Sequence, residues 1–296
     1  MIPARFEYHA AKTVPEAVAL LEHYGEDAKV LAGGQSLLPM MKLRLAEPRH
    51  LVDISAIGEL RAIREEGGLL YIGAGVTEAG AIASELLGNK CPLICETARQ
   101  IGDPQVRNRG TLGGNLAHGD PGNDQPAVML ALGASVTLRG KVGERSFPVD
   151  GFYRGLYETQ LQPGELLVNV RVPVPPPHSG YSYRKLKRKT GDFATAAAAV
   201  QLSLDSAGNC ARIGIALTNV APMAVKVRDA EQLLTGERIT TELIEQAAQI
   251  AMSVCDPAED LHGPAEYRIQ MAGEMTRRAI GEALARASRH WHGGQD

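Results

Sequence analysis

"VLAGGQSLLPM", residues 30–40, joins a short apolar run to two adjacent glycines, followed by a glutamine and a serine. A second glycine pair stands in "GTLGGN", residues 110–115. Glycine has no Cβ atom and readily adopts positive φ, so a pair lets successive backbone N–H groups point at one anion, such as a diphosphate. A tight turn explains an isolated pair at least as well. Because two pairs occur, each near a serine or threonine hydroxyl, the two interpretations stand about level.

Neither pair belongs to a common phosphate-binding fingerprint. The sequence contains no G-x-x-x-x-G-K-[ST] motif, and "GAGVTEAG" at residues 73–80 lacks the third glycine of G-x-G-x-x-G at the required place. That segment is instead interpreted as a strand ending in a turn. The residues alone therefore predict no more than a nucleotide-like ligand held by loops.

The composition excludes several classes of protein. With 296 residues, 44% hydrophobic and 22% charged, the chain is typical of a globular protein of two or three domains. A net charge of −3 and an aromatic content of 4% argue against a nucleic-acid surface. No apolar run approaches the roughly 18 residues of a membrane span, and "MIPARFEYHAAKTV" lacks the pattern of a secretory signal. We therefore expect no nucleic-acid partner, no membrane span and a cytoplasmic location.

Metal ligands are not predicted at any position. The spacing of the cysteines fits neither a zinc nor an iron–sulfur motif, so they are interpreted as buried reduced thiols. They are Cys91, Cys95, Cys210 and Cys255. His118 is the only histidine near the glycine motifs, and no second ligand stands at a suitable spacing.

Periodicity predicts alternating helices and strands in the first half. Residues 13–25 form an amphipathic helix, with Thr13 at its start and Gly25 at its end. Strands are predicted in "DAKVLAGG", "HLVDIS", "LLYIGAG" and "SVTLRG". Residues 170–180 contain four prolines, which predicts a stiff extended boundary segment that no helix or central strand contains.

After this segment, three strands and then three helices indicate a separate α+β layer. The strands are predicted in "YSYRKLK", "ATAAAAVQLSL" and "ARIGIALTNV", and the helices between about residues 223 and 288. The alanines at 196–199 fit a helix by propensity, but their Thr195 and Val200 flanks favour a strand. The end of the chain is predicted to be flexible.

Two further segments have open interpretations. In "HGDPGNDQPA", residues 118–127, the acidic and amide side chains form either a solvated turn with a helix cap or a rigid loop that binds sugar hydroxyls or a base edge. In "YRKLKRKTGDFAT", residues 183–195, Lys185, Lys187 and Lys189 share one strand face, which is either solvated, a partner surface or turned toward a ligand. Phe193 is assigned to the core by default.

These segments together resemble the FAD-binding medium subunits of the molybdenum hydroxylases, the xanthine dehydrogenase family. The likeness is greatest to the medium subunits of aerobic carbon monoxide dehydrogenases, and it extends from residue 2 to about residue 287. It rests on "AGGQSLLPMMKLRLAEP", "DPQVRNRGTLGGNLAHGDPGNDQPA", "GELLVNVRVP", "YSYRKLKRKTGDFATAAAA" and "GPAEYRIQMAGEM".

The resemblance implies an α+β fold of the vanillyl-alcohol-oxidase (PCMH) type. Two α+β subdomains, residues 1–57 and 58–177, would bind FAD between them. A C-terminal domain, residues 178–287, would contain a three-stranded antiparallel sheet and a helical bundle, and residues 288–296 would form a flexible tail.

The resemblance also implies the residues that bind FAD, without a covalent tether. Both glycine pairs would hold the diphosphate, Asn123 and Asp124 the sugar and adenine end, and Leu167, Lys185 and Phe193 would lie near the isoalloxazine. In the family, position 35 is often histidine and position 193 of the carbon monoxide dehydrogenases is tyrosine. The residues of the two loops are Ala32, Gly33, Gly34, Gln35, Ser36 and Leu37, and Thr111, Gly113, Gly114 and Asn115.

The implied activity is electron transfer, with no catalytic acid–base residue in this chain. Electrons would come from a molybdopterin cofactor in a large subunit through [2Fe-2S] clusters in a small subunit, within a dimer of heterotrimers. The substrate of the complex would be carbon monoxide, a purine or another N-heterocycle such as nicotine or quinoline. The alternatives are a free-standing FAD oxidoreductase, which needs a general base near the flavin, and a scaffold without flavin.

Overall fold

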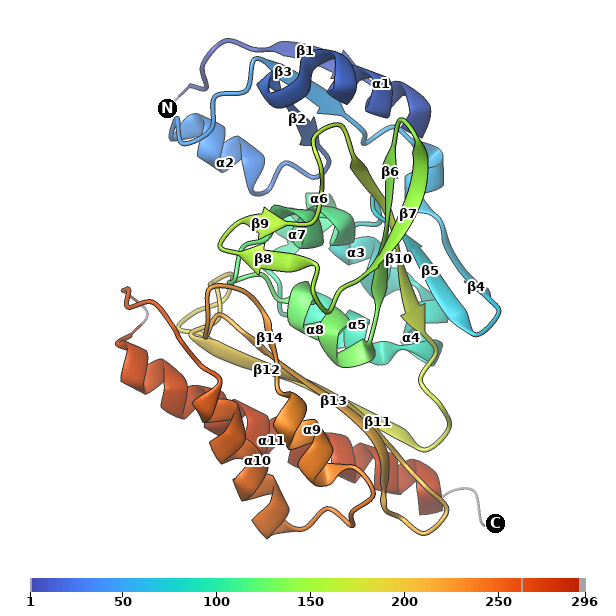
Figure 1. The fold of residues 1–296 in the computed structure, drawn as a ribbon, viewed down its shortest axis with the longest axis vertical. Helices are drawn as coiled ribbons and strands as arrows, with labels where there is room; N and C mark the ends of the chain where they lie inside the picture. The colour runs from blue at the N-terminus through green and yellow to red at the C-terminus, as the bar shows by residue number, and fades with distance from the viewer. Residues whose placement is uncertain (1, 262, 293–296) are drawn as a thin grey trace.

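Three layers stacked along the long axis make up the protein, as seen in a computed structural model that describes residues 2–261 and 263–292 (Figure 1). The N-terminal layer is a parallel three-stranded sheet in the order β1-β3-β2. Its strands are β1 (Glu7–Ala10), β2 (Ala28–Leu31) and β3 (His50–Asp53), and its helical segments are α1 (Val14–Tyr24), η1 (Gly25–Asp27) and α2 (Leu37–Lys42). The predicted start of α1 is confirmed, because the Thr13 hydroxyl accepts a hydrogen bond from the Glu16 N–H at 3.2 Å.

The middle layer is an antiparallel five-stranded sheet in the order β4-β5-β10-β6-β7. Its strands are β4 (Ile63–Glu66), β5 (Leu69–Gly73), β6 (Ser135–Gly140), β7 (Gly143–Pro148) and β10 (Leu166–Pro173). The short helix η2 (Gly58–Arg61) precedes it, and a hairpin of β8 (Tyr153–Gly155) and β9 (Glu158–Thr159) stands beside it. Its helices are α3 (Glu78–Ala83), α4 (Glu85–Lys90), α5 (Pro92–Ala98), α6 (Pro104–Arg109), α7 (Leu112–His118) and α8 (Gln125–Leu132).

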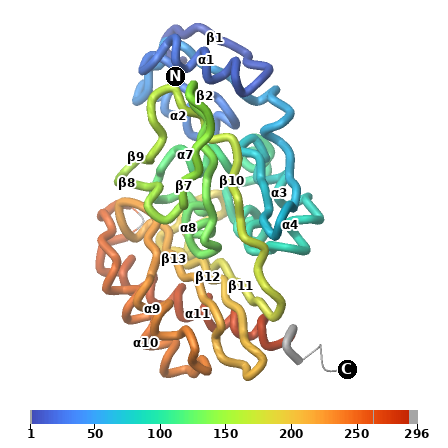
Figure 2. The backbone as a smooth tube through the Cα atoms, turned by 45° about the vertical axis from the view of Figure 1, so that its right-hand side comes forward, coloured from blue at the N-terminus to red at the C-terminus, as the bar shows by residue number. Residues whose placement is uncertain are grey.

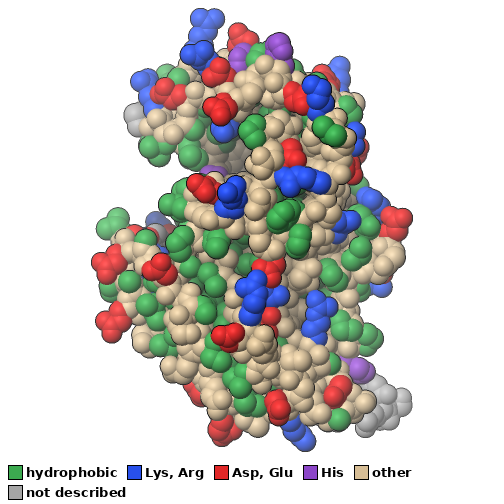
Figure 3. Space-filling model, viewed as in Figure 1, with side chains coloured by type: hydrophobic (Ala, Val, Ile, Leu, Met, Phe, Trp, Pro, Cys, Tyr) green, Lys and Arg blue, Asp and Glu red, His purple; other side chains and the backbone are tan. Residues whose placement is uncertain are grey.

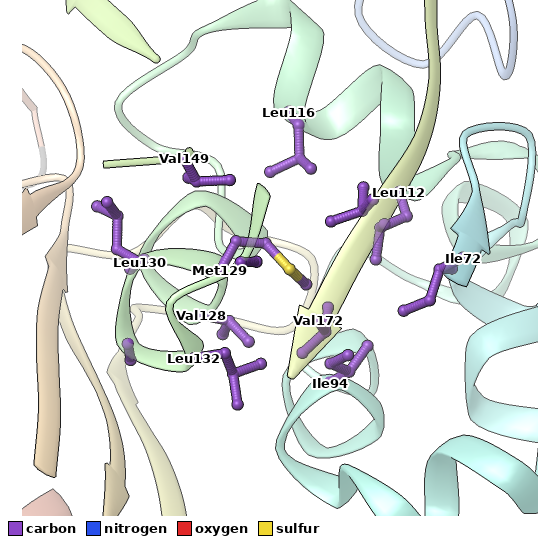
Figure 4. Close-up of a cluster of buried hydrophobic side chains, with 14 of the residues drawn as sticks. Ile72, Ile94, Leu112, Leu116, Val128, Met129, Leu130, Leu132, Val149 and Val172 are labelled. Atoms are coloured by element: carbon purple, nitrogen blue, oxygen red, sulfur yellow. The ribbon is translucent and has the colours of Figure 1, made fainter. Parts of the chain in front are cut away.

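The core of the middle layer anchors the helix that follows the second glycine pair. Figure 4 shows Leu112 and Leu116 of α7 turned toward Met129 of α8 and Val172 of β10. All four side chains are buried. Burying a side chain of this size stabilises the fold by about 1.5–3 kcal/mol, so the start of α7 is fixed by packing.

The prediction that no central strand contains the proline-rich segment is wrong at its beginning. β10 is the central strand of the middle sheet and continues through Pro173, which pairs with Leu69 of β5. Pro173 is the last residue of the strand, so its missing N–H removes a donor only at the end of the ladder. The connection to the next layer is therefore limited to residues 174–178.

The C-terminal layer is an antiparallel sheet covered by helices, and Figure 2 shows these helices along its outer side. Its three long strands are confirmed as β11 (Ser179–Leu186), β12 (Ala196–Leu204) and β13 (Cys210–Thr218). A fourth strand of two residues, β14 (Val225–Lys226), extends the sheet and was not expected. The helices are α9 (Arg228–Leu234), α10 (Thr241–Ser253) and α11 (Ala265–His292).

The alanine run at 196–199 forms a strand because both faces of the sheet are covered. Ala196 and Ala198 pack into the core beneath the C-terminal helices, whereas Ala197 and Ala199 pack into the core of the middle layer. Small side chains let helices approach the sheet from both sides.

Helix α11 continues through residues 288–292, where the flexible tail was expected to begin. Residues 293–296 of that expected tail lie outside the described residues. None of the helices in the described part of the chain is both long and apolar enough to cross a bilayer.

Candidate cofactor-binding site

The two glycine loops come from different layers and meet at a cleft. A Cβ atom on Gly33 would lie 2.1 Å from the Arg109 carbonyl oxygen, and one on Gly110 would lie 3.7 Å from Cγ of Gln35. The first loop follows β2, and the second connects α6 to α7. Figure 3 shows the surface hollowed between the N-terminal layer and the middle layer on this side of the molecule.

The first loop, residues 32–37, has the properties of an anion cradle. Gly34 has a φ of +75°, which a side chain would strain, and Gly33 has no room for a Cβ atom. Within residues 2–261 and 263–292, no hydrogen bond uses the N–H groups of residues 33–36. Four successive donors at a cleft suit a phosphate group.

The second loop, residues 110–115, uses its glycines for packing. A Cβ atom on Gly113 would lie 2.4 Å from Cβ of Ala74, so only glycine fits there. The N–H of Gly113 donates to the Ala74 carbonyl at 3.0 Å, and those of Gly114 and Asn115 donate to the Thr111 hydroxyl and carbonyl at 3.1 and 2.9 Å. This loop therefore offers side chains to a ligand: the Thr111 hydroxyl and Asn115, whose buried Oδ1 has no hydrogen-bond partner in the described structure.

The loop at 118–127 is tied to the second glycine loop. Nδ2 of Asn123 donates to the Asn115 carbonyl at 2.7 Å. Asp120 closes the turn by accepting a hydrogen bond from the Gly122 N–H at 2.8 Å. Asp124 stands at the N-cap position of α8, but its side chain makes no capping hydrogen bond.

Asp124 instead forms a buried ion pair with Lys185 at the junction of the middle and C-terminal layers. Nζ of Lys185 lies 2.8 Å from Oδ2 of Asp124, and their side chains are 1% and 5% exposed. The Tyr183 hydroxyl donates to the other carboxylate oxygen. Burial raises the pKa of Asp124, and the lysine and the tyrosine oppose that shift. The pair fixes the start of α8 against β11.

The other residues predicted to lie near the isoalloxazine ring of FAD differ in solvent exposure. Phe193 is 50% exposed, so its assignment to the core is wrong, and a Cβ atom on Gly122 would lie 3.0 Å from its ring. Leu167 is buried in the core of the middle layer. Nζ of Lys187 donates to the Gln100 carbonyl at 3.4 Å, and burial and the neighbouring Lys185 lower the pKa of Lys187.

Two site residues were missed by the sequence analysis. Nε2 of Gln125 donates to Oε2 of Glu78 at 2.8 Å, and both side chains are buried beneath the second glycine loop. Burial raises the pKa of Glu78 to about 8, with a contribution from the neighbouring Asp124. The other carboxylate oxygen of Glu78 and the amide oxygen of Gln125 have no hydrogen-bond partner in the structure as described. The only signal was an acidic residue in "VTEAG", which was interpreted as part of a turn.

The cysteines form no metal site among the described residues. Cys91, Cys95 and Cys210 are buried free thiols, as predicted, and Cys255 is half-buried. Burial raises the pKa of Cys91 to about 12, which keeps the thiol protonated at neutral pH.

The fold and the cleft define a class of protein, a binder of a phosphate-containing cofactor. Free backbone N–H groups stand on one wall, and hydroxyl and amide side chains stand on the other. The buried Asp124–Lys185 ion pair lies at the junction with the C-terminal layer. The donors therefore fit FAD.

Comparison with known proteins identifies the family. The sequence matches the family described as FAD binding domain in molybdopterin dehydrogenase over residues 4–175, and CO dehydrogenase flavoprotein C-terminal domain over residues 181–283. It is 52% identical to the carbon monoxide dehydrogenase medium chain of Hydrogenophaga pseudoflava, over 97% of this chain and 100% of that protein. It is 38% identical to the 6-hydroxypseudooxynicotine dehydrogenase complex subunit alpha of Paenarthrobacter nicotinovorans, over 97% of both chains.

The fold agrees with this assignment. The solved carbon monoxide dehydrogenase from Hydrogenophaga pseudoflava matches it with a TM-score of 0.95 and 54% identity, over 97% of this chain and 99% of that chain. The chain belongs to the family of FAD-binding subunits of the molybdopterin dehydrogenases. The resemblance noted in the sequence is thereby confirmed.

Proposed function

We propose that this chain is the electron-transfer subunit of a carbon monoxide-oxidising molybdenum enzyme. The observation that supports the substrate is 52% identity to a carbon monoxide dehydrogenase medium chain over that protein's full length. The identity to a relative named for a nicotine-derived compound is 38%. An N-heterocycle is therefore the second candidate substrate.

When bound, FAD accepts electrons singly and releases them singly or in pairs. The chain's own residues bind and orient it. The N–H groups of residues 33–36 would hold the diphosphate, together with the Thr111 hydroxyl. Asn123 and Asp124 would hold the sugar and adenine end, and Lys185, Leu167 and Phe193 would set the environment of the ring. The half-exposed Phe193 is the natural shield for one edge of the ring.

The proposed partners are a small subunit with [2Fe-2S] clusters and a large subunit with the molybdopterin cofactor. Two such heterotrimers would associate in the cytoplasm. The proposal is supported by the likeness to a carbon monoxide dehydrogenase medium chain and by the cysteines, none of which belongs to a group of metal-ligating side chains among the described residues. The substrate is then oxidised outside this chain.

The absorbance spectrum of the purified chain, followed by acid release of the pigment, tests the cofactor assignment. We expect about one FAD per chain. Acid precipitation should release the FAD into the supernatant and leave the precipitated protein without flavin absorbance. A folded chain that neither contains nor takes up FAD would contradict the assignment and favour the flavin-free scaffold.

The substrate is tested with the complex purified from its native host or co-expressed with both partner genes. We expect dye reduction with carbon monoxide and none with nicotine, quinoline or hypoxanthine. Reduction by an N-heterocycle alone would favour the second candidate. Substrate oxidation by the isolated chain would identify a free-standing oxidoreductase.

A further inference from the structure

Three side chains of the types that ligate metals converge on the N-terminal sheet, on strands β1 and β3. Nε2 of His9 lies 3.2 Å from Nδ1 of His50, and Oε2 of Glu7 lies 3.6 Å from the same Nδ1. All three ligand atoms lie within 4.8 Å of one another, and no other such cluster of three occurs in the described residues. Figure 3 shows histidine side chains gathered at the surface of this layer.

The pairing of β1 with β3 brings these residues together. Glu7 stands directly opposite His50 in the parallel register, and His9 is two residues further along β1. Because side chains two apart in a strand point to the same face, all three lie on one face of the sheet. That face is the one covered by α1, since Val52, two residues after His50, packs into the α1 core.

Tyr24, the last residue of α1, fixes the two imidazoles. Its ring stacks on His50 at 3.7 Å between centroids, with an interplanar angle of 13°. It also stacks on His9 at 4.8 Å and 26°. Ring orientations set by packing reduce the ordering cost of ligation.

The spacing agrees with first-row metal coordination. A tetrahedral ion with bonds of about 2.0–2.1 Å separates its ligand atoms by about 3.3 Å. Two of the three separations, 3.2 and 3.6 Å, fall on either side of this value, and the third is no more than 4.8 Å. Two imidazoles and one carboxylate suit Zn²⁺ or a similar transition metal better than Mg²⁺ or Ca²⁺, which prefer oxygen ligands.

We propose that Glu7, His9 and His50 form a binding site for a divalent transition metal ion of the Zn²⁺ class. Glu7 is 69% exposed at the side chain, so the fourth coordination position faces water. The ion would fasten β1, an edge strand of four residues, to the central strand β3. The site is separate from the cleft, so flavin content does not depend on it.

The test is calorimetric titration of the metal-free, untagged full-length chain with Zn²⁺. We expect one tight site per chain, and at least a tenfold weaker affinity in His9→Asn and in His50→Asn. The control variant is His23→Asn, because His23 contacts Tyr24 but is not a ligand. Flavin absorbance serves as the control for folding and should be unchanged in every variant.

A hydrogen bond between the two imidazoles is the competing explanation of their distance. If it is the whole explanation, the wild type and the His9→Asn/His50→Asn double variant will bind Zn²⁺ equally. Zn²⁺ should also raise the melting temperature of the wild type and of His23→Asn only. Anomalous scattering at the zinc edge from soaked crystals locates the ion independently of the variants. A peak elsewhere, or none among these three side chains, would overturn the site.

Discussion

Asp124 and Lys185 form a buried ion pair, so replacing only one of them by a neutral residue leaves the other charge buried and unpaired. Lys185→Met leaves a buried carboxylate without its cation, which destabilises a protein by about 3–5 kcal/mol. We expect that loss in the unfolding free energy measured by urea denaturation. Adding Asp124→Asn should recover part of it, because no charge then remains buried.

Lys187→Met is the matched control for this prediction. Nζ of Lys187 donates to the Gln100 carbonyl oxygen and, among the described residues, forms no ion pair, so Asp124 attracts it only at longer range. We expect it to change the unfolding free energy by less than about 1 kcal/mol. Equal effects of the two lysine variants would show that the Asp124 carboxylate does not need its partner.

Gly34 tests the anion cradle at a single position. With φ at +75°, Gly34→Ala strains the backbone by about 1–2 kcal/mol and tilts the N–H groups on either side. We expect the variant to release FAD more readily, by about tenfold in dissociation constant. Gly58→Ala is the control, since its Cβ atom would meet nothing within 4 Å. Full flavin retention in Gly34→Ala, measured by flavin fluorescence, would contradict the cradle.

Glu78 makes stability depend on pH. Its pKa is raised from 4.5 to about 8 in the folded chain, so the folded state binds a proton that the unfolded state has lost. The unfolding free energy should therefore fall as the pH rises from about 4.5 to 8 and level off above. Glu78→Gln, which has no proton to lose, should flatten this decline in urea denaturation series. An unchanged slope in the variant would assign the effect to other groups.

At the scale of elements, strand β13 and helix α8 approach as closely as their backbones allow. A Cβ atom on Gly214 would lie 1.9 Å from the Ala131 carbonyl oxygen. Gly214→Ala must move the helix, and overpacking of this kind costs about 1–3 kcal/mol. Gly88→Ala, in α4 with nothing within 4 Å, should instead stabilise by about 0.5–1 kcal/mol. Thermal unfolding of both variants checks the opposite signs.

Sequence patterns predicted the helices and strands whose ends or periodicity are marked by residues within the element itself. Thr13 and Gly25 mark the ends of α1, and both act as caps in the structure. Strand β14 has two residues, too few for a periodicity, so it was missed. The proline-rich segment 170–180 was predicted as the boundary, but its first residues continue central strand β10 through Pro173, which pairs with Leu69.

Only the part of the site that is built from contiguous motifs was predicted from the sequence. The glycine loops are contiguous motifs, but the reason for each glycine depends on what it touches, and Gly113 is required by Ala74. Glu78 and Gln125 are 47 residues apart, and Glu7 and His50 meet through strand pairing. No spacing in the sequence shows such contacts, because only the tertiary fold creates them.

At the scale of the whole molecule, the middle and C-terminal layers share one core. Tyr183 and Ala194 pack into the cluster built on the middle sheet, together with residues of β12 and β13. The three larger sheets fall one in each of the segments 1–57, 58–177 and 178–287, and the β8–β9 hairpin lies in the second of these segments. The exact domain limits stay a prediction, and the shared core implies that the last two segments depend on each other for stability.

Glu96 joins these two layers from the middle one. Its carboxylate accepts hydrogen bonds from the Tyr183 N–H at 2.8 Å and from Nη1 of Arg286, on α11, at 2.6 Å. Hydrogen bonds to a charged group contribute about 1.5–3 kcal/mol, so Glu96→Gln should lower the melting temperature in calorimetry. Because the core is shared, the middle and C-terminal layers should still melt in one transition.

Glu274→Gln is the matched control for Glu96→Gln. Among the described residues, Glu274 forms ion pairs with Arg277 and Arg278 of its own helix alone, so its loss should change the unfolding free energy by less than about 0.5 kcal/mol. Equal shifts in the two variants would mean that Glu96 acts as a surface charge. A separate transition for the C-terminal layer would mean that the shared core does not couple the layers. If contacts between the layers hold the molecule together, we expect a single melting transition in both variants. Glu96→Gln should lower its melting temperature, and Glu274→Gln should not.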